Sequence, residues 1–471
     1  MTIREFAYYG IVLIGAVGYF WALRWWKLRL LSFCTINYVL ALILALLPGY
    51  SIAAGEAVGG NGHGFDETLY TLYLLFAILT PIGIVVGRQW GTRMHLSGEV
   101  RPHASARMAL LMIFVVAYTL AYVVWLPYVP FHDLLLQRID VSEAAFERVD
   151  ITHQWASVAA NPPFVFRYWR PIIQELSLLG FAYFTAVHYS AARPRLQKRN
   201  SVGLLLLFGF TAYCMVFTLE KATLIYLVWC YFLIRHMIDP RRVLKRMVFL
   251  SVTVLALCCV MLVVFMGVET LPDTLSAIWF RMQGQTASVY VQNEYIMSHG
   301  FLGLHGIHMP VLSSLLGADY YVNLPGYAYE VLLPELSANG RVGSAAGFSI
   351  AELYFAFGWW GAALFGVVVT AYGFLDQVIL NSCQEASLGI RERAINVGFY
   401  AATSSWYSLL LVGSVLGILS FPFVCSETFF FFLAGYLLVM KVHGIKMRSV
   451  AARWRLLGRD ARSPLAGGAD A

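Results

Sequence analysis

Charged side chains are scarce in this chain. Only 13% of its 471 residues are charged, whereas 59% are hydrophobic, and this balance excludes an ordinary soluble domain. The net charge of +7 does not indicate a nucleic-acid partner, because the basic residues stand in short runs between apolar stretches of about 20 residues. The sequence therefore predicts an all-α polytopic membrane protein with a single integral membrane domain over 1–471.

Cysteine is also sparse, and no internal repeat is visible. None of the seven cysteines falls in a loop that we expect to face outward, so no disulfide framework supports those loops. The cysteines are Cys34, Cys214, Cys230, Cys258, Cys259, Cys383 and Cys425.

Apolar runs predict about 11 transmembrane helices. They cover roughly 6–23, 30–50, 68–87, 108–127, 172–190, 203–219, 222–237, 247–267, 350–375, 396–418 and 421–440. The sixth and seventh belong to one run, 203–235, which would be about 50 Å long as a helix, against a hydrocarbon core of about 30 Å. We therefore expect the chain to fold back at Glu220-Lys221.

The basic residues predict the orientation of these spans. Most of the 33 lysine and arginine residues fall on one side, which the positive-inside rule assigns to the cytoplasm. The N-terminus then lies outside, residues 6–23 remain as the first span because no small-residue cleavage site follows them, and 441–471 is a cytoplasmic basic tail. The outward loops are 51–67 and two large ones, 128–171 and 268–349, which we expect to contain helices and to carry the function.

Arginines in the outward loops suggest a phosphate-bearing ligand. A guanidinium binds phosphate through two parallel N–H donors and stays charged at any relevant pH. The alternative is that each arginine pairs with an anionic lipid headgroup or a nearby acid such as Asp140, Glu147, Asp273 or Glu335. The candidate diphosphate-binding residues are Arg167, Arg170, Arg281 and Arg341.

Histidines gather in the segment HGFLGLHGIHMP, as His299, His305 and His308. The nearest acids, Glu294 and Asp319, do not complete a metal-ligand set, so we expect no metal. The histidines either pack at the interface, or His305 or His308 acts as a general base that accepts a proton from a sugar hydroxyl.

Ionisable residues inside apolar runs are costly unless they pair or face water. Among Glu220, Lys221, Glu352, Asp376 and Glu427, Glu352 is the strongest candidate for a catalytic residue. It follows a glycine- and serine-rich entry and lies about one turn inside a helix, where the positive end of the helix favours an acid. A purely structural cap is the alternative. The series Gly358, Gly361 and Gly366 is more typical of close helix packing than of binding.

One segment resembles a known family. The run from IHMPVLSSLLG through NGRVGSAAGFSIAELYFAFGWWGAALFG is similar to the C-terminal third of bacterial oligosaccharide repeat-unit polymerases of the O-antigen polymerase type. In that family, a proline and a small loop lead to a glycine and serine stretch, then to an acid and an aromatic-Phe-Gly-x-x-Gly pattern. The corresponding features here are Met309-Pro310, Gly343 to Ser349, Glu352 and Tyr354 to Gly361.

The resemblance implies a fold like that of lipid-linked-sugar glycosyltransferases and a location in the bacterial inner membrane, with a periplasmic N-terminus. The expected activity is metal-independent and cofactor-free polymerization of polyprenyl-diphosphate-linked oligosaccharide repeat units at the periplasmic face. Membrane lipids and a chain-length regulator protein are the other expected partners. The alternatives are an O-antigen ligase or another lipid-linked-sugar glycosyltransferase, and a flippase or transporter for such lipids, which should show symmetric halves and a charged path through many spans.

Overall fold

The computed structural model is mostly helical. It describes residues 2–55, 65–139, 143–144, 147–148, 151, 163–166, 168–190, 194–239, 245, 248–249, 252–253, 256, 271–306, 322–338, 347–385, 388–408, 411–412 and 427–447. Five described helices are long and apolar enough to cross a membrane, and three shorter apolar helices accompany them. The chain is therefore a helical protein of membrane type, and the number of spans stays a prediction.

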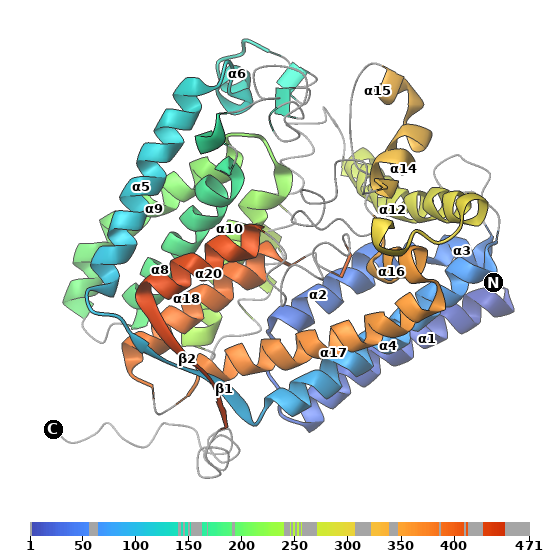
Figure 1. The fold of residues 1–471 in the computed structure, drawn as a ribbon, viewed down its shortest axis with the longest axis horizontal. Helices are drawn as coiled ribbons and strands as arrows, with labels where there is room; N and C mark the ends of the chain where they lie inside the picture. Colours follow the sequence, from blue (N-terminus) through green and yellow to red (C-terminus); the bar gives the residue numbers. More distant parts are fainter. Residues whose placement is uncertain are drawn as a thin grey trace.

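Three long helices form one group of the fold. They are α1 (Ile3–Trp25), α4 (Glu67–Gly91) and α17 (Trp359–Ser382), which lie side by side in Figure 1. A fourth segment packs against them: α2 (Phe33–Ala41) continues through the π-helix η1 (Leu42–Leu46) to α3 (Tyr50–Ala54).

Glycines bring α4 and α17 into direct backbone contact. A methyl group at Gly87 would overlap the carbonyl oxygen of Thr370, and one at Gly373 would overlap that of Ile84. At Gly91 it would lie 2.7 Å from the carbonyl oxygen of Phe374. Small residues at such spacing let two helices approach closely in an apolar environment, where van der Waals packing drives association.

A second group surrounds α8. It contains α5 (Ala104–Trp125), the π-helix η4 (Pro171–Glu175), α8 (Leu176–Ser190), α9 (Pro194–Val216), α10 (Lys221–Ile238), α18 (Ile390–Trp406) and α20 (Glu427–Val439). Helices α9 and α10 contact each other and are separated by a break at 217–220, where Leu219 has φ of 56°. The predicted reversal at Glu220-Lys221 is thus confirmed as a helix break.

A two-stranded antiparallel sheet lies where the two groups meet in Figure 1. Strand β1 (Met94–Val100) follows α4, and β2 (Met440–Met447) follows α20. The register pairs Met94 with Met447 and Val100 with Met440, with an irregularity at Ser97/Gly98. The sequence did not predict strands, because these two short segments are far apart in the chain and only their pairing stabilises them.

Two ends of the molecule can be distinguished. At the end that carries the sheet, Arg391 Nη2 donates to Ser105 Oγ (2.7 Å), Ser105 Oγ hydrogen-bonds Tyr183 Oη (3.0 Å), and Leu96 N donates to Ser382 Oγ (2.7 Å). These bonds join the start of α18 to the start of α5, the start of α5 to the middle of α8, and β1 to the end of α17. We refer to this as the basic end, because it holds Arg24, Lys27, Arg29, Arg88, Arg93, Arg101, Arg107, Arg235, Arg391, Arg393, Lys441 and Lys446.

The opposite end, which we refer to as the loop end, carries the helices of the two large predicted loops and the short helix that follows the second loop. They are α6 (Pro130–Leu135), the 3-10 helix η3 (Phe164–Phe166), α12 (Leu271–His299), the 3-10 helix η6 (Gly303–Gly306), α14 (Leu324–Leu332), α15 (Pro334–Ala338) and α16 (Ser349–Phe357). The prediction that these loops contain helices is confirmed for the described parts.

The predicted span 350–375 requires a correction. It is two helices, since α16 ends at Phe357 and α17 begins at Trp359. Gly358 between them has φ of 61°, a conformation that costs little only for glycine. Gly361 then packs directly on the backbone of Leu353, as expected for close packing, whereas a methyl group at Gly366 would find only ordinary contacts at 3.8 Å.

Candidate functional site

Glu352, His305 and Arg170 are the predicted site residues whose side chains the structure describes. Glu352 lies in α16, His305 lies in η6, and Arg170 lies immediately before η4, so all three are at the loop end. The backbone of Arg281 lies within α12. Arg167, His308 and Arg341 lie outside the described residues, as does Met309-Pro310.

Aromatic packing fixes the place where α16 begins. Phe348 precedes the helix and lies against Tyr73 and Phe76 of α4, with ring centroids 4.4 Å apart in both pairs. Ser349 Oγ donates a hydrogen bond to the carbonyl oxygen of Leu411 (2.7 Å). The first turn of α16, which carries Glu352, is therefore held against the first helix group at the loop end.

The Glu352 carboxyl group lies in a polar niche built around a glycine. Its Oε1 atom is buried, and a methyl group added at Gly347 would lie 2.7 Å from that atom and 3.2 Å from Oε1 of Gln292. Two oxygen acceptors from different helices thus converge on a point that only glycine leaves open. The first turn of α16 adds a positive potential from its free N–H groups, which favours the ionised carboxylate.

Helix α12 supplies a row of buried amides beside this niche. Gln292 Nε2 donates to Ser288 Oγ (2.9 Å), and Asn293 Nδ2 donates to Asp66 Oδ2 (2.8 Å). Asp66 also caps α4 by accepting from Leu69 N (2.9 Å). The Oδ1 atom of Asn293 is buried and accepts no hydrogen bond from the residues that the structure describes. Such an acceptor suits a hydroxyl-bearing ligand or a water molecule.

Tyr290 completes this cluster on α12. Burial raises the pKa of its phenol, and the negative charge of Asp66 raises it further. The hydroxyl group therefore stays protonated and remains a hydrogen-bond donor at neutral pH. We refer to Asp66, Tyr290, Gln292, Asn293, Gly347 and Glu352 together as the α12–α16 cluster.

Arg170 is paired with an acid that the sequence reading did not select as its partner. Its Nη2 atom lies 2.8 Å from Glu220 Oε1, and the two side chains are 50% and 16% exposed. Gln174 Nε2 donates to the other oxygen of Glu220 (2.9 Å). The alternative that such an arginine pairs with an acid is thus observed for Arg170, through Glu220 at the break between α9 and α10. Half of the guanidinium side chain still faces outward.

His305 lies beside α16 but is exposed. The turn that carries it is held by a bond from Leu302 N to the carbonyl oxygen of Phe355 (3.1 Å), and His305 O accepts from Val322 N (2.9 Å). His299, in contrast, stacks on Tyr295 with ring centroids 4.1 Å apart, which fits a packing role. Within the described residues, no three histidine, cysteine or acidic side chains are grouped as metal ligands.

Loop 128–171 contributes a separate group of acids at the loop end. Burial raises the pKa of Glu147 to about 7, and the like charges of Asp133 and Glu143 add to this shift. Asp133 also lines a cavity of about 390 Å³ together with His132 and Arg138. Glu147 therefore changes charge near neutral pH, and this group of acids belongs to the second helix group rather than to the α12–α16 cluster.

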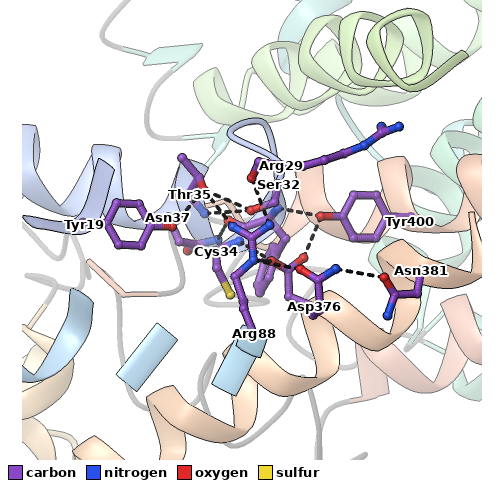
Figure 2. Close-up of polar contacts among 12 residues, drawn as sticks. Tyr19, Arg29, Ser32, Cys34, Thr35, Asn37, Arg88, Asp376, Asn381 and Tyr400 are labelled. Atoms are coloured by element: carbon purple, nitrogen blue, oxygen red, sulfur yellow. Dashed lines mark hydrogen bonds and ion pairs between the residues drawn. The ribbon is translucent and has the colours of Figure 1, made fainter. Parts of the chain in front are cut away.

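A buried ion pair lies between the glycine-packed helices α4 and α17. The side chains of Arg88 and Asp376 are fully buried, and Arg88 Nε lies 3.8 Å from Asp376 Oδ2. Figure 2 shows residues from α1, α2, α17 and α18 converging on this pair. Tyr400 of α18 donates to Asp376 Oδ1 (2.6 Å) and accepts from Phe33 N (2.8 Å).

The guanidinium group of Arg88 has a partner at each nitrogen. Its Nε donates to Gln377 Oε1 (3.2 Å), its Nη1 to Thr35 Oγ1 (3.4 Å) and its Nη2 to the carbonyl oxygen of Arg29 (2.9 Å). A buried guanidinium requires such a full set of hydrogen-bond acceptors, because burying an unpaired charge costs several kcal/mol of folding free energy. A void of about 10 Å³ lies nearby, lined in part by Phe33 and Cys34. The network therefore has the character of a structural clamp.

The position of Arg88 requires a correction. The sequence predicts that the basic residues stand between apolar runs and mark the cytoplasmic side, Arg88 among them, whereas this residue lies buried inside α4. A usable signal was present, because Gly83, Gly87 and Gly91 recur every four residues around it. That spacing predicts a closely packed helix face, and an arginine next to such a face is drawn into the contact.

Comparison of the chain with models of known protein families, with curated proteins and with solved structures finds no match in any of the three.

Proposed function

We propose that the chain is a metal-independent glycosyltransferase that joins polyprenyl-diphosphate-linked oligosaccharide repeat units at its loop end. The observation that carries the proposal is the α12–α16 cluster, in which the carboxyl group of Glu352 and the amide oxygen of Gln292 converge on Gly347. An acid at a helix start, with the amide oxygen of Gln292 beside it, is a suitable environment for binding sugar hydroxyls and accepting a proton. The resemblance of the surrounding segment to repeat-unit polymerases agrees with this assignment.

The reaction we propose is a displacement at the anomeric carbon of the donor sugar. A hydroxyl oxygen of the acceptor repeat unit forms the new bond to that carbon, and the bond to the diphosphate oxygen breaks. Its electron pair leaves with the polyprenyl diphosphate, and the hydroxyl proton passes to Glu352. The carboxylate form needed for this step is favoured by the start of α16. His305 is the alternative base, because it is exposed on the turn bonded to α16.

Stabilising the leaving diphosphate requires fixed positive charge. Arg170 retains an exposed half of its side chain beside Glu220, so we assign it to the rim of the site, together with Arg167, Arg281 and Arg341. In the proposed arrangement the loop end faces the periplasm, the basic end faces the cytoplasm of the inner membrane, and the chain crosses about 11 times. A chain-length regulator would then meet the periplasmic loops.

A transport function is the second candidate, and the ion pair of Arg88 and Asp376 is the observation that favours it. Intramembrane charges often mark a path for ions or lipids. Against this, the partners of Arg88 are all supplied by the protein, and the adjoining void of about 10 Å³ holds at most about one water molecule. A ligase that uses the same donor lipid would need the same chemistry. A ligase and a polymerase are therefore distinguished by their products.

The experiment is a comparison of Glu352→Gln with Glu335→Gln in cells that lack the native gene. Glu335 is an exposed acid of α15 at the same end of the molecule, so it serves as the matched control. We expect Glu352→Gln to reduce the surface glycan from a long ladder to single repeat units, with the protein still at its normal level in the membrane. Glu335→Gln should give a normal ladder. A full ladder from Glu352→Gln would refute the assignment of the base, and loss of single units as well would favour a ligase or flippase.

A further inference from the structure

A lateral cavity lies between α8, α9 and α10, away from the α12–α16 cluster. Its volume is about 440 Å³, which is within the range of sites that hold small molecules. Helix α9 contributes Ser201, Leu204, Leu205 and Phe208, which are spaced as one helix face. Helix α10 contributes Val228, Tyr231 and Phe232 in the same manner. The cavity is thus a groove along these three helices, and Thr253 also lines it.

The groove opens toward the surface that faces lipid if these helices lie in a membrane. On α9, Leu205 is 69% exposed and Phe208 is 37% exposed, and both belong to the apolar segment Ser201–Val216 of that helix. Leu204 and Phe232 extend the apolar lining. A hydrocarbon chain can therefore enter sideways from a bilayer without crossing a polar surface.

A cluster of polar groups lies at one end of the groove. His188 and Tyr189 come from the last turn of α8, and the hydroxyl oxygens of Tyr189 and Tyr231 lie 3.2 Å apart. The guanidinium carbon of Arg235, one turn beyond Tyr231 on α10, lies 4.0 Å from the centre of the Tyr189 ring. All of these groups are at the basic end. The contact with the ring positions the guanidinium at this end of the groove.

We infer that this groove binds the hydrocarbon chain of a phosphate-bearing membrane lipid, with the phosphate held against Arg235, Tyr189 and Tyr231. The chain lies along α9, in contact with Leu204 and Phe208. Arginine and tyrosine donors recognise phosphate oxygens, and the apolar groove recognises the chain. A glycerophospholipid and a polyprenyl phosphate share this chemistry. The inference does not depend on the transferase activity, because the groove is formed by other helices than the α12–α16 cluster.

Leu204→Trp and Leu206→Trp test the groove as a matched pair. Both place an indole on α9, but only Leu204 lines the cavity, whereas Leu206 is 70% exposed outside it. Delipidated, purified protein is titrated separately with dioleoyl phosphatidylglycerol, undecaprenyl phosphate and dioleoylglycerol, and bound lipid is counted by native mass spectrometry. We expect Leu204→Trp to lower the affinity for the phosphate-bearing lipid about tenfold, and Leu206→Trp to bind like the wild type. Equal affinities of the two variants would overturn the inference.

Arg235→Gln tests the phosphate, with Arg93→Gln, an exposed residue of the basic end, as its control. Loss of one charge-assisted contact should weaken binding about tenfold in Arg235→Gln alone. Dioleoylglycerol should bind weakly to every variant, and binding as tight as that of phosphatidylglycerol would refute the phosphate assignment. Preference for undecaprenyl phosphate or for phosphatidylglycerol identifies the source of the lipid, and either result supports the site.

A second measurement needs no substitution. A phosphatidylglycerol and a polyprenyl phosphate, each with a diazirine in the hydrocarbon chain, are photo-cross-linked to the wild-type protein, and the labelled peptides are mapped. Labelling concentrated on 201–208 and 228–235 would support the groove. Labelling spread evenly over lipid-exposed helices such as α1 would overturn it. Neither readout uses glycan length, so failure here leaves the proposed transferase activity unaffected.

Discussion

Removing one charge of the Arg88 and Asp376 pair should destabilise the fold more than removing both. Arg88→Met deletes the bonds to Gln377, Thr35 and the carbonyl oxygen of Arg29, and it leaves a buried carboxylate with only neutral partners. The loss of one partner from a buried pair costs about 3 to 5 kcal/mol. Asp376→Asn should fall toward the lower end of that range, because Arg88 keeps its three oxygen acceptors.

The double variant Arg88→Met/Asp376→Asn should recover part of this loss. With both charges absent, no uncompensated charge is buried, so its free energy of unfolding should exceed the additive expectation by about 2 kcal/mol. The measurement is reversible denaturation in detergent micelles, followed by circular dichroism. The control is Arg138→Met, since Arg138 is 68% exposed in its pair with Asp133 and should cost at most about 1 kcal/mol. Strictly additive single losses, or an Arg88→Met cost equal to that of Arg138→Met, would refute the clamp.

Three further predictions follow from other parts of the structure. Gly87→Ala should destabilise the protein and raise its sensitivity to proteolysis, because the added methyl group overlaps the carbonyl oxygen of Thr370. The control Gly10→Ala should have neither effect, because a methyl group there meets no atom within 4 Å. Equal effects of the two variants would contradict the packing of α4 on α17. Glu147 has a pKa raised from 4.5 to about 7, so its contribution to stability is complete below pH 4.5 and is lost as the pH rises through 7. The thermal midpoint of Glu147→Gln should therefore exceed that of the wild type by an amount that grows between pH 5 and pH 8. A difference that does not change with pH would contradict the burial of this acid. Arg170→Lys should retain more glycan polymerization than Arg170→Ala, because it keeps the charge near Glu220 but loses the planar fork; equal ladders from both variants would remove Arg170 from the site.

The helical, membrane-type character of the chain was accessible from its long apolar runs. The break at Glu220 could be predicted because an apolar helix of about 50 Å exceeds the membrane core. The break at Gly358 could not, since a single glycine is compatible with a continuous helix and only the packing of Gly361 on Leu353 requires the bend. The sheet of β1 and β2 was inaccessible for a different reason, because its strands are separated by most of the chain.

The sequence identified the central residue of the candidate site but not the residues that surround it. Glu352 stood out as an acid just inside an apolar helix. Gln292, Asn293 and Asp66 carry no local signal, because amides and acids are common in loops and at helix starts. Their role depends on the way α12 crosses the beginnings of α4 and α16, which is a tertiary contact. Arg88 was misassigned for the converse reason, since an arginine near a span end is usually exposed and this one is enclosed by neighbouring helices.

The most direct test of the proposed function is reconstitution of the purified protein in proteoliposomes with a single substrate, the undecaprenyl-diphosphate-linked repeat unit. Products are resolved by length in the presence of a chelator. The account predicts chains of two or more repeat units from the wild type and from Glu335→Gln, and single units only from Glu352→Gln. Absence of any extended chain from the folded wild-type protein, or equal extension by Glu352→Gln, would contradict it.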